Sequence, residues 1–281
     1  MKFEIVNCLS SQGDGAANED AVGHAHTPAY TDFWVIDGAT SVADQAYVAG
    51  ETSDPAWFAQ ELSREIALAC VERELRLDDV LRQAIGRVRD RYVEAVGGLA
   101  SVPVYAWPLA ALTIVRASRR DGRLVFTGRC LGDCPAFVSD GAWVPLWQPH
   151  TKGDQPAYLS ENLDRVQLKE RIRRRRSEQH AKPLMGVVVP DPDCVAYARH
   201  VHFEAGAAHL VLMSDGFARL FQEYGLTRAE DVMRQLERPG TAEGLIARLR
   251  EAEQPGPADK RPLIYKNGDD ATVIAVAFDG A

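Results

Sequence analysis

The order of strand-like and helix-like segments is the feature that most limits how this chain can fold. Strands are predicted by nine runs rich in branched and aromatic residues. These runs lie at 3–8, 33–36, 109–115, 124–127, 136–138, 143–146, 195–203, 209–213 and 272–278. Helical periodicity interrupts them in only two places. Strands and helices therefore do not alternate, which disfavours a doubly wound sheet and favours antiparallel sheets covered by helices.

The helical segments are predicted as two pairs. The first pair covers 55–75 and 79–96, where apolar residues recur at helical spacing. In the second pair, one helix is expected to begin at Thr227, with Glu230 three residues later as the partner of a capping box. The other helix of this pair covers 242–252. An α+β fold is the class that this order predicts.

Charge and composition exclude several classes of protein. The 281 residues include 32 Lys and Arg and 40 Asp and Glu, and this net charge of −8 disfavours nucleic acid and anionic membranes as partners. No apolar run approaches the ~20 residues of a membrane helix, and Glu4 lies where a signal peptide needs apolar residues. Five scattered cysteines are typical of free thiols in a reducing compartment. We expect a cytoplasmic protein, and we take it to be a monomer.

One basic segment departs from this acidic average. Residues 151–182 hold nine Lys or Arg and five Asp or Glu, a net charge of +4. Five of the arginines lie between Arg171 and Arg176. We expect a flap-like insert here, within a single domain that covers 1–281. Two interpretations stay open, a solvated surface helix or loop and a docking surface for a phosphorylated or acidic partner.

Carboxylates stand at the ends of apolar runs. In chain order they are Glu19-Asp20, Asp37-Gly38, Asp215-Gly216 and Asp269-Asp270. Any one Asp-Gly pair is also typical of a simple turn. A carboxylate beside the core is costly unless it meets a cation or several hydrogen-bond donors. Antiparallel pairing could gather these strand ends, and hard oxygen ligands without His or Cys suit Mg²⁺ or Mn²⁺.

Five short motifs follow one another from residue 18 to residue 272. They are Asn18-Glu19-Asp20, Val35-Ile36-Asp37-Gly38, Leu131-Gly132-Asp133, Ser214-Asp215-Gly216 and Asp269-Asp270-Ala271-Thr272. In this order they resemble the motifs of the metal-dependent protein phosphatases, the protein phosphatase 2C family. The resemblance implies a four-layer α-β-β-α sandwich, in which two antiparallel sheets pack face to face with helix pairs outside.

The resemblance also implies a set of metal ligands for two ions, with a possible third. Asp37 is expected to bridge two divalent ions, Mg²⁺ or Mn²⁺, and the Gly38 carbonyl to bind the second. Asp215 and Asp269 complete the site of the first ion. Asp133, together with Asp215, is expected to bind the weaker third ion. A residue of a strand-end turn is the alternative interpretation of Asp133.

The expected reaction follows from charge. A phosphate monoester repels an anionic nucleophile, so two divalent ions neutralise its oxygens and lower the pKa of a bridging water to give hydroxide. Glu19 and Asp20 are expected to orient metal-bound water, and Glu19 is also a candidate ligand. With Asp37 and Asp215 they form the expected catalytic set. The expected substrates are phosphoserine and phosphothreonine in proteins, so the enzyme would oppose a Ser/Thr kinase.

The chain departs from the family pattern at the phosphate-binding position. The family commonly has an arginine about four residues before the motif Glu, and this chain has Gly15 there. Backbone amides of this loop, Arg129, Lys152 or Arg219 are candidate replacements.

The position of the general acid differs as well. Eukaryotic members have a histidine after the second motif, where this chain has Ala39-Thr40-Ser41, so a metal-bound water or Thr40 is expected to take its place. Two alternatives therefore stay open beside the protein phosphatase. One is a weak or inactive pseudophosphatase that acts as a binding module, and the other is a hydrolase of small phosphate esters.

Overall fold

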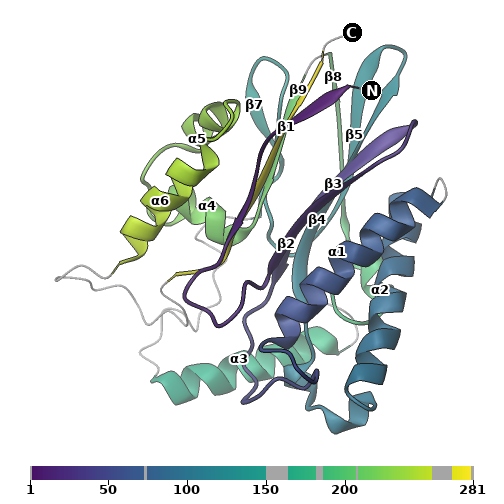
Figure 1. The fold of residues 1–281 in the computed structure, drawn as a ribbon, viewed down its shortest axis with the longest axis vertical. Helices are drawn as coiled ribbons and strands as arrows, with labels where there is room; N and C mark the ends of the chain where they lie inside the picture. Colours follow the sequence, from purple (N-terminus) through teal and green to yellow (C-terminus); the bar gives the residue numbers. More distant parts are fainter. Residues whose placement is uncertain are drawn as a thin grey trace.

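Two five-stranded antiparallel sheets pack face to face in the computed structural model, with helices on both outer faces (Figure 1). The structure describes residues 2–72, 75–149, 164–181, 186–206, 208–254 and 268–279. The predicted α+β sandwich of four layers is confirmed.

The first sheet contains both the first and the last strand of the chain, paired side by side. Its order is β1 (Phe3–Ser11), β10 (Ala271–Phe278), β9 (Ala208–Met213), β6 (Ala136–Ser139) and β7 (Trp143–Trp147). The helices on its outer face are α4 (Asp215–Gln222), α5 (Ala229–Leu236) and α6 (Ala242–Glu253). Apolar side chains such as Phe217, Met233 and Leu245 form the core between these helices and the sheet.

The second sheet is formed by strands from the first half of the chain and one late strand. Its order is β2 (Asp20–His26), β3 (Tyr30–Gly38), β4 (Ala110–Arg120), β5 (Arg123–Leu131) and β8 (Arg199–Ala205). The long helices α1 (Asp54–Glu72) and α2 (Leu77–Ala95) cover its outer face. Short 3₁₀ helices lie at Leu99–Ser101, Val104–Ala106 and Pro192–Tyr197.

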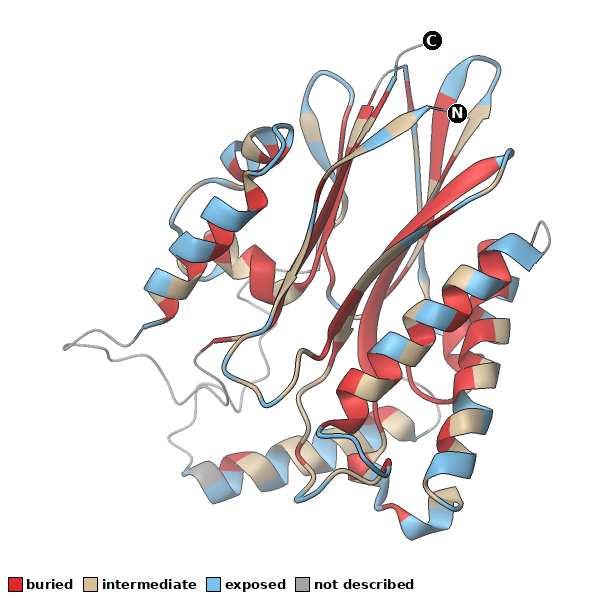
Figure 2. Ribbon diagram, in the orientation of Figure 1, coloured by how far each residue is buried: buried red, intermediate tan, exposed pale blue. Residues whose placement is uncertain are grey.

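The central core lies between the sheets, where the inward faces of the strands are buried (Figure 2). Phe33, Phe126 and Ile274 are fully buried there. Each such side chain stabilises the fold by roughly 1.5–3 kcal/mol. This packing fixes the relative positions of the strand ends, from which the site is built.

Helix α3 (Arg165–His180) lies across one end of the two sheets, against the 3₁₀ helix Val104–Ala106 (Figure 1). Asp164 caps it, accepting hydrogen bonds from the Val166 and Gln167 backbone N–H groups. This helix is the described part of the basic segment, of which residues 151–163 and 182 lie outside the described chain. None of the described helices combines the length and the apolar character that a membrane crossing requires.

Some predicted elements are wrong. No capping box opens at Thr227, because α5 begins at Ala229 behind Arg228, which makes no side-chain cap. The first part of the strand predicted at 195–203 belongs to the 3₁₀ helix Pro192–Tyr197. Strand β2 and helices α3 and α4 interrupt the predicted order. Strand β2 lacks a clear local signal and is held by full pairing with β3. Helix α3 is almost wholly polar, whereas α4 is short and its apolar residues, such as Phe217 and Leu220, pack in the core beside the first sheet.

The attachment of α3 to the rest of the fold is expected to depend on pH through the side chain of His180. Its Nε2 donates a hydrogen bond to the Trp107 carbonyl oxygen at 3.2 Å, and burial lowers the pKa of His180 from 6.5 to about 4. Between these pH values the unfolded chain binds the proton more tightly than the folded chain. The contribution of neutral His180 is therefore complete above pH 6.5 and is lost as the pH falls towards 4.

We expect the melting temperature to fall over this pH range, and to fall less in the His180→Gln variant. Circular dichroism melts at pH 7, 6, 5 and 4 measure the difference between the two proteins, which removes the common effect of the carboxylates. A difference that does not change with pH would contradict this assignment.

Candidate metal centre

Strand pairing brings predicted carboxylates from distant segments to one end of the sheets. Asp20, the first residue of β2, pairs directly with Asp37 near the end of β3. Asp215 follows β9 and opens α4, while Asp269 precedes β10. Because β9 and β10 are antiparallel neighbours, the end of one lies beside the beginning of the other. The fold thus gathers these residues at one end of the sandwich.

Glycine follows Asp37 and Asp215 because neighbouring backbone atoms lie too close for a side chain, and not because the chain turns there. A Cβ on Gly38 would collide with the Glu19 carbonyl oxygen, which accepts a hydrogen bond from the Gly38 N–H at 2.9 Å. A Cβ on Gly216 would collide with the Asp270 carbonyl oxygen. Gly38 ends a strand and Gly216 lies in a helix, so the simple-turn interpretation is wrong for both.

A cavity of about 320 Å³ opens at this end of the molecule. Four of the predicted residues line it, namely Asp37, Asp133, Asp215 and Asp269. Thr40, the candidate proton donor, also lines the cavity. The structure therefore brings together the four aspartates that the motifs singled out as metal ligands.

The four aspartates repel one another around the cavity, where Asp37, Asp215 and Asp269 are half-buried and Asp133 is exposed. Burial raises the pKa of Asp37 well above its usual value, and Asp215 adds to the effect. Burial, with the charges of Asp133 and Asp269, raises the pKa of Asp215 to about 8. The pKa of Asp133 is also raised, first by burial. A positive charge placed among these carboxyl groups would stabilise their charged forms and so lower the raised pKa values.

Glu19 and Asp20 lie behind the cavity and do not line it. The Ser53 hydroxyl donates to Glu19 Oε1 at 2.6 Å, and the Glu19 backbone N–H donates to Asp270 Oδ2 at 2.7 Å. Asp20 is buried, and its Oδ2 has no hydrogen-bond partner among the described residues. Burial raises the pKa of Asp20 to about 7. Their expected roles in orienting water, and that of Glu19 as a ligand, stay predictions.

The carboxylate oxygens suit divalent cations as ligands, although the described side chains do not form a complete coordination site. The four carboxylates of the cavity are the hard oxygen ligands that Mg²⁺ and Mn²⁺ prefer, and buried Asp20 nearby has an oxygen without a partner among the described residues. Across the described ranges, no group of three or more His, Cys, Asp or Glu side chains is placed to hold a metal ion. The chemistry of the donor set therefore supports a metal centre without showing its coordination.

Of the cations expected at the cavity, the structure places Arg219 there and adds two that were not expected, Arg175 and Arg176. Arg175 and Arg176 of α3 line it, and so does Arg219 of α4. Arg129 does not line it and instead forms an ion pair with Asp78. Lys152 lies outside the described residues. The run of arginines at 171–176 was the available signal for α3, but the sequence could not place it beside the motifs.

The family and the fold are those of a class of enzymes, the serine/threonine protein phosphatases. The family model for protein phosphatase 2C matches residues 9–252, and the chain belongs to this family. No curated protein matches the sequence.

Solved structures of bacterial phosphatases share the fold. The serine/threonine phosphatase PstP of Mycobacterium tuberculosis is 15% identical with a TM-score of 0.55, and the match covers 99% of this chain and 98% of that one. The S. agalactiae serine/threonine phosphatase is 14% identical with a TM-score of 0.57, covering 99% and 100%. A PstP catalytic domain in complex with two manganese ions is 16% identical, with a TM-score of 0.54 and coverage of 99% and 98%.

Proposed function

We propose that this chain hydrolyses phosphoserine and phosphothreonine in proteins with the help of divalent metal ions. The observation that carries the proposal is the cavity in which four aspartates from separate motifs meet. Membership of the protein phosphatase 2C family supports the reaction class, and the manganese ions in the PstP structure support the cofactor.

The aspartates are the proposed ligands. Asp37, Asp215 and Asp269, with the Gly38 carbonyl, would hold two ions, and Asp133 with Asp215 would hold a third. When bound, the ions would supply positive charge for the phosphoryl oxygens and make a water a better nucleophile.

Other residues of the chain are proposed to donate a proton to the leaving group and to orient the attacking water. Attack by water forms one P–O bond while the ester P–O bond breaks, so the leaving seryl or threonyl oxygen must take up a proton. The Thr40 hydroxyl, which lines the cavity, or a water is proposed to donate this proton. Asp20 and Glu19, buried behind the cavity, are proposed to orient the attacking water.

The proposal includes the setting of the enzyme. A single catalytic domain over 1–281, with the insert at 151–182, is proposed because the family match covers residues 9–252 and the first sheet pairs β1 with β10. The net charge of −8 disfavours nucleic acid as a substrate, and the free cysteines support a cytoplasmic location. We propose that the protein acts on phosphoproteins as a monomer. A Ser/Thr kinase would supply its substrates.

The test is hydrolysis of para-nitrophenyl phosphate and a phosphothreonine peptide with Mn²⁺, Mg²⁺ or a chelator. We expect turnover that requires metal and falls roughly 10³-fold or more in Asp215→Ala, because the lost charge stabilisation amounts to several kcal/mol. Asp90→Ala, on the exposed side of α2, is the matched control.

The two alternatives give different results in the same experiment. Silence on both substrates, with Mn²⁺ still bound, would favour the pseudophosphatase. Free phosphometabolites turned over as well as the phosphopeptide would favour the small-ester hydrolase.

A further inference from the structure

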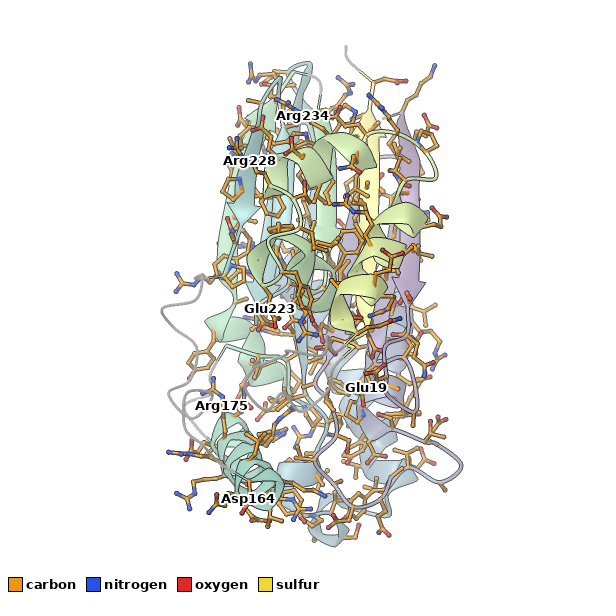
Figure 3. All side chains as sticks on the ribbon, turned by 90° about the vertical axis from the view of Figure 1, so that its left-hand side faces the viewer. Glu19, Asp164, Arg175, Glu223, Arg228 and Arg234 are labelled. Atoms are coloured by element: carbon orange, nitrogen blue, oxygen red, sulfur yellow. The ribbon has the colours of Figure 1, made fainter. Side chains whose placement is uncertain are left out.

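Helix α3 presents one face to the cavity, opposite the aspartates. Four of its residues line the cavity, namely Ile172, Arg175, Arg176 and Gln179. Their spacing of three, four and seven residues places them on one side of a helix. Figure 3 shows Arg175 on the side of α3 that lies towards the ends of the sheets. The cavity thus has an acidic wall from the strand ends and a basic wall from α3.

The position of α3 is fixed by contacts with the loop after β3. Arg176 Nη2 donates to the Thr40 carbonyl oxygen at 3.2 Å, and Arg173 Nε donates to the Val42 carbonyl oxygen at 3.0 Å. Arg173 also forms an ion pair with Asp44 at 2.9 Å. The same loop follows directly from Asp37, so the basic wall is held at a set place relative to the acidic one.

The charges of the two walls act on one another. Burial raises the pKa of Asp133, while the positive charges of Arg175 and Arg176 oppose that rise. The other arginine of the cavity, Arg219, is paired with Glu223 at 2.7 Å. A substrate phosphate that approaches four carboxylates needs cations of its own, and no Lys or Arg occurs in the loop at 12–18 around Gly15.

We propose that Arg175 and Arg176 of α3 bind the phosphate group of the substrate while the aspartates face it from the other side. Guanidinium groups suit this task because they form paired hydrogen bonds with phosphate oxygens. A cavity of about 320 Å³ admits a phosphorylated side chain and not a folded surface. This proposal rests on the proposed phosphatase function, which it makes more specific.

The kinetic test compares the wild type with Arg175→Ala, Arg175→Lys and Arg175→Ala/Arg176→Ala on a phosphothreonine peptide with Mn²⁺. Since a charge-assisted hydrogen bond to phosphate is strong, we expect KM to rise about tenfold in Arg175→Ala and about 100-fold in the double variant. Arg175→Lys should recover part of the loss. Arg174→Ala is the matched control, since Arg174 is an exposed arginine of the same helix that does not line the cavity.

A binding test separates this proposal from the function on which it rests. Inorganic phosphate is titrated calorimetrically into the same proteins with Mn²⁺, and their melting temperatures are recorded to show that α3 is still folded. The proposal expects phosphate affinity to fall at least tenfold in the double variant and to stay unchanged in Arg174→Ala.

The outcomes are distinguishable. Phosphate binding that depends on the two arginines in a wild type without turnover would support this inference and overturn the proposed function. Turnover in the wild type with unchanged KM and unchanged phosphate affinity in a folded double variant would overturn the inference and leave the function standing. An equal loss in Arg174→Ala would show a general charge effect and would also overturn it.

Discussion

Replacing Asp37 by asparagine is expected to abolish Mn²⁺ binding and phosphatase turnover without weakening the metal-free fold. Asp37 is half-buried and lines the cavity with the other aspartates, and its raised pKa records the cost of a negative charge there. The amide of Asn has nearly the same shape and no charge, so repulsion within the cluster decreases. The melting temperature of Asp37→Asn in chelator should therefore be no lower than that of the wild type in chelator.

Calorimetric titration with Mn²⁺ measures the first part of this prediction. We expect the affinity for Mn²⁺ to fall roughly 100-fold or more. Replacing even a residue that only supports a metal ligand lowers metal affinity about 10–100-fold. Asp90→Asn makes the same chemical change on exposed α2 and should bind as the wild type does. Unchanged Mn²⁺ affinity in Asp37→Asn would contradict the assignment of the metal centre.

Truncating Asp32 to alanine is expected to give the largest loss of stability among single changes remote from the cavity. Asp32 is fully buried in β3, and both its oxygens accept hydrogen bonds from Arg116 at 2.7 Å. The same guanidinium lies 3.5 Å from the centre of the Tyr30 ring. Without Asp32 this charge stays largely buried with no carboxylate, which costs about 3–5 kcal/mol.

Urea unfolding followed by tryptophan fluorescence measures this loss as a lower midpoint. Glu230→Ala, which breaks the exposed Glu230–Arg234 pair, should cost less than ~1 kcal/mol. The double variant Asp32→Leu/Arg116→Met should recover much of the stability, because no charge is then left buried. A loss in Asp32→Ala as small as that in Glu230→Ala would show that the buried pair contributes little.

The sequence was informative where apolar runs end in acidic motifs. The Asp-Gly pairs at 37 and 215, the pair Asp269-Asp270 and the motif Leu131-Gly132-Asp133 predicted the four aspartates of the cavity, since residues fixed at strand ends follow the sheet. The four-layer sandwich was predicted from the family that these motifs resemble. The branched residues of β3, β9 and β10 made those strands easy to predict.

Residues outside regular apolar patterns were harder to place. Strand β2 contains His24, Gly23 and His26, which carry no strand signal, and it exists because it pairs with β3. Helix α3 is almost wholly polar, so no apolar stripe shows which face turns inward. That Arg175 and Arg176 line the cavity depends on contacts with the loop at Thr40 and Val42, which no local pattern encodes.

The pairing of β1 with β10 has a consequence for how the protein is made. Strand β10 lies between β1 and β9 in the first sheet, and Asp269 and Asp270 immediately precede it. While residues 268–278 are still inside the ribosome, the nascent chain lacks the strand that joins β1 to β9 and the cavity residue Asp269. The first sheet can therefore be completed only after these residues have emerged, as slow-forming contacts between distant segments require. A partly synthesised copy thus cannot bring the four aspartates together.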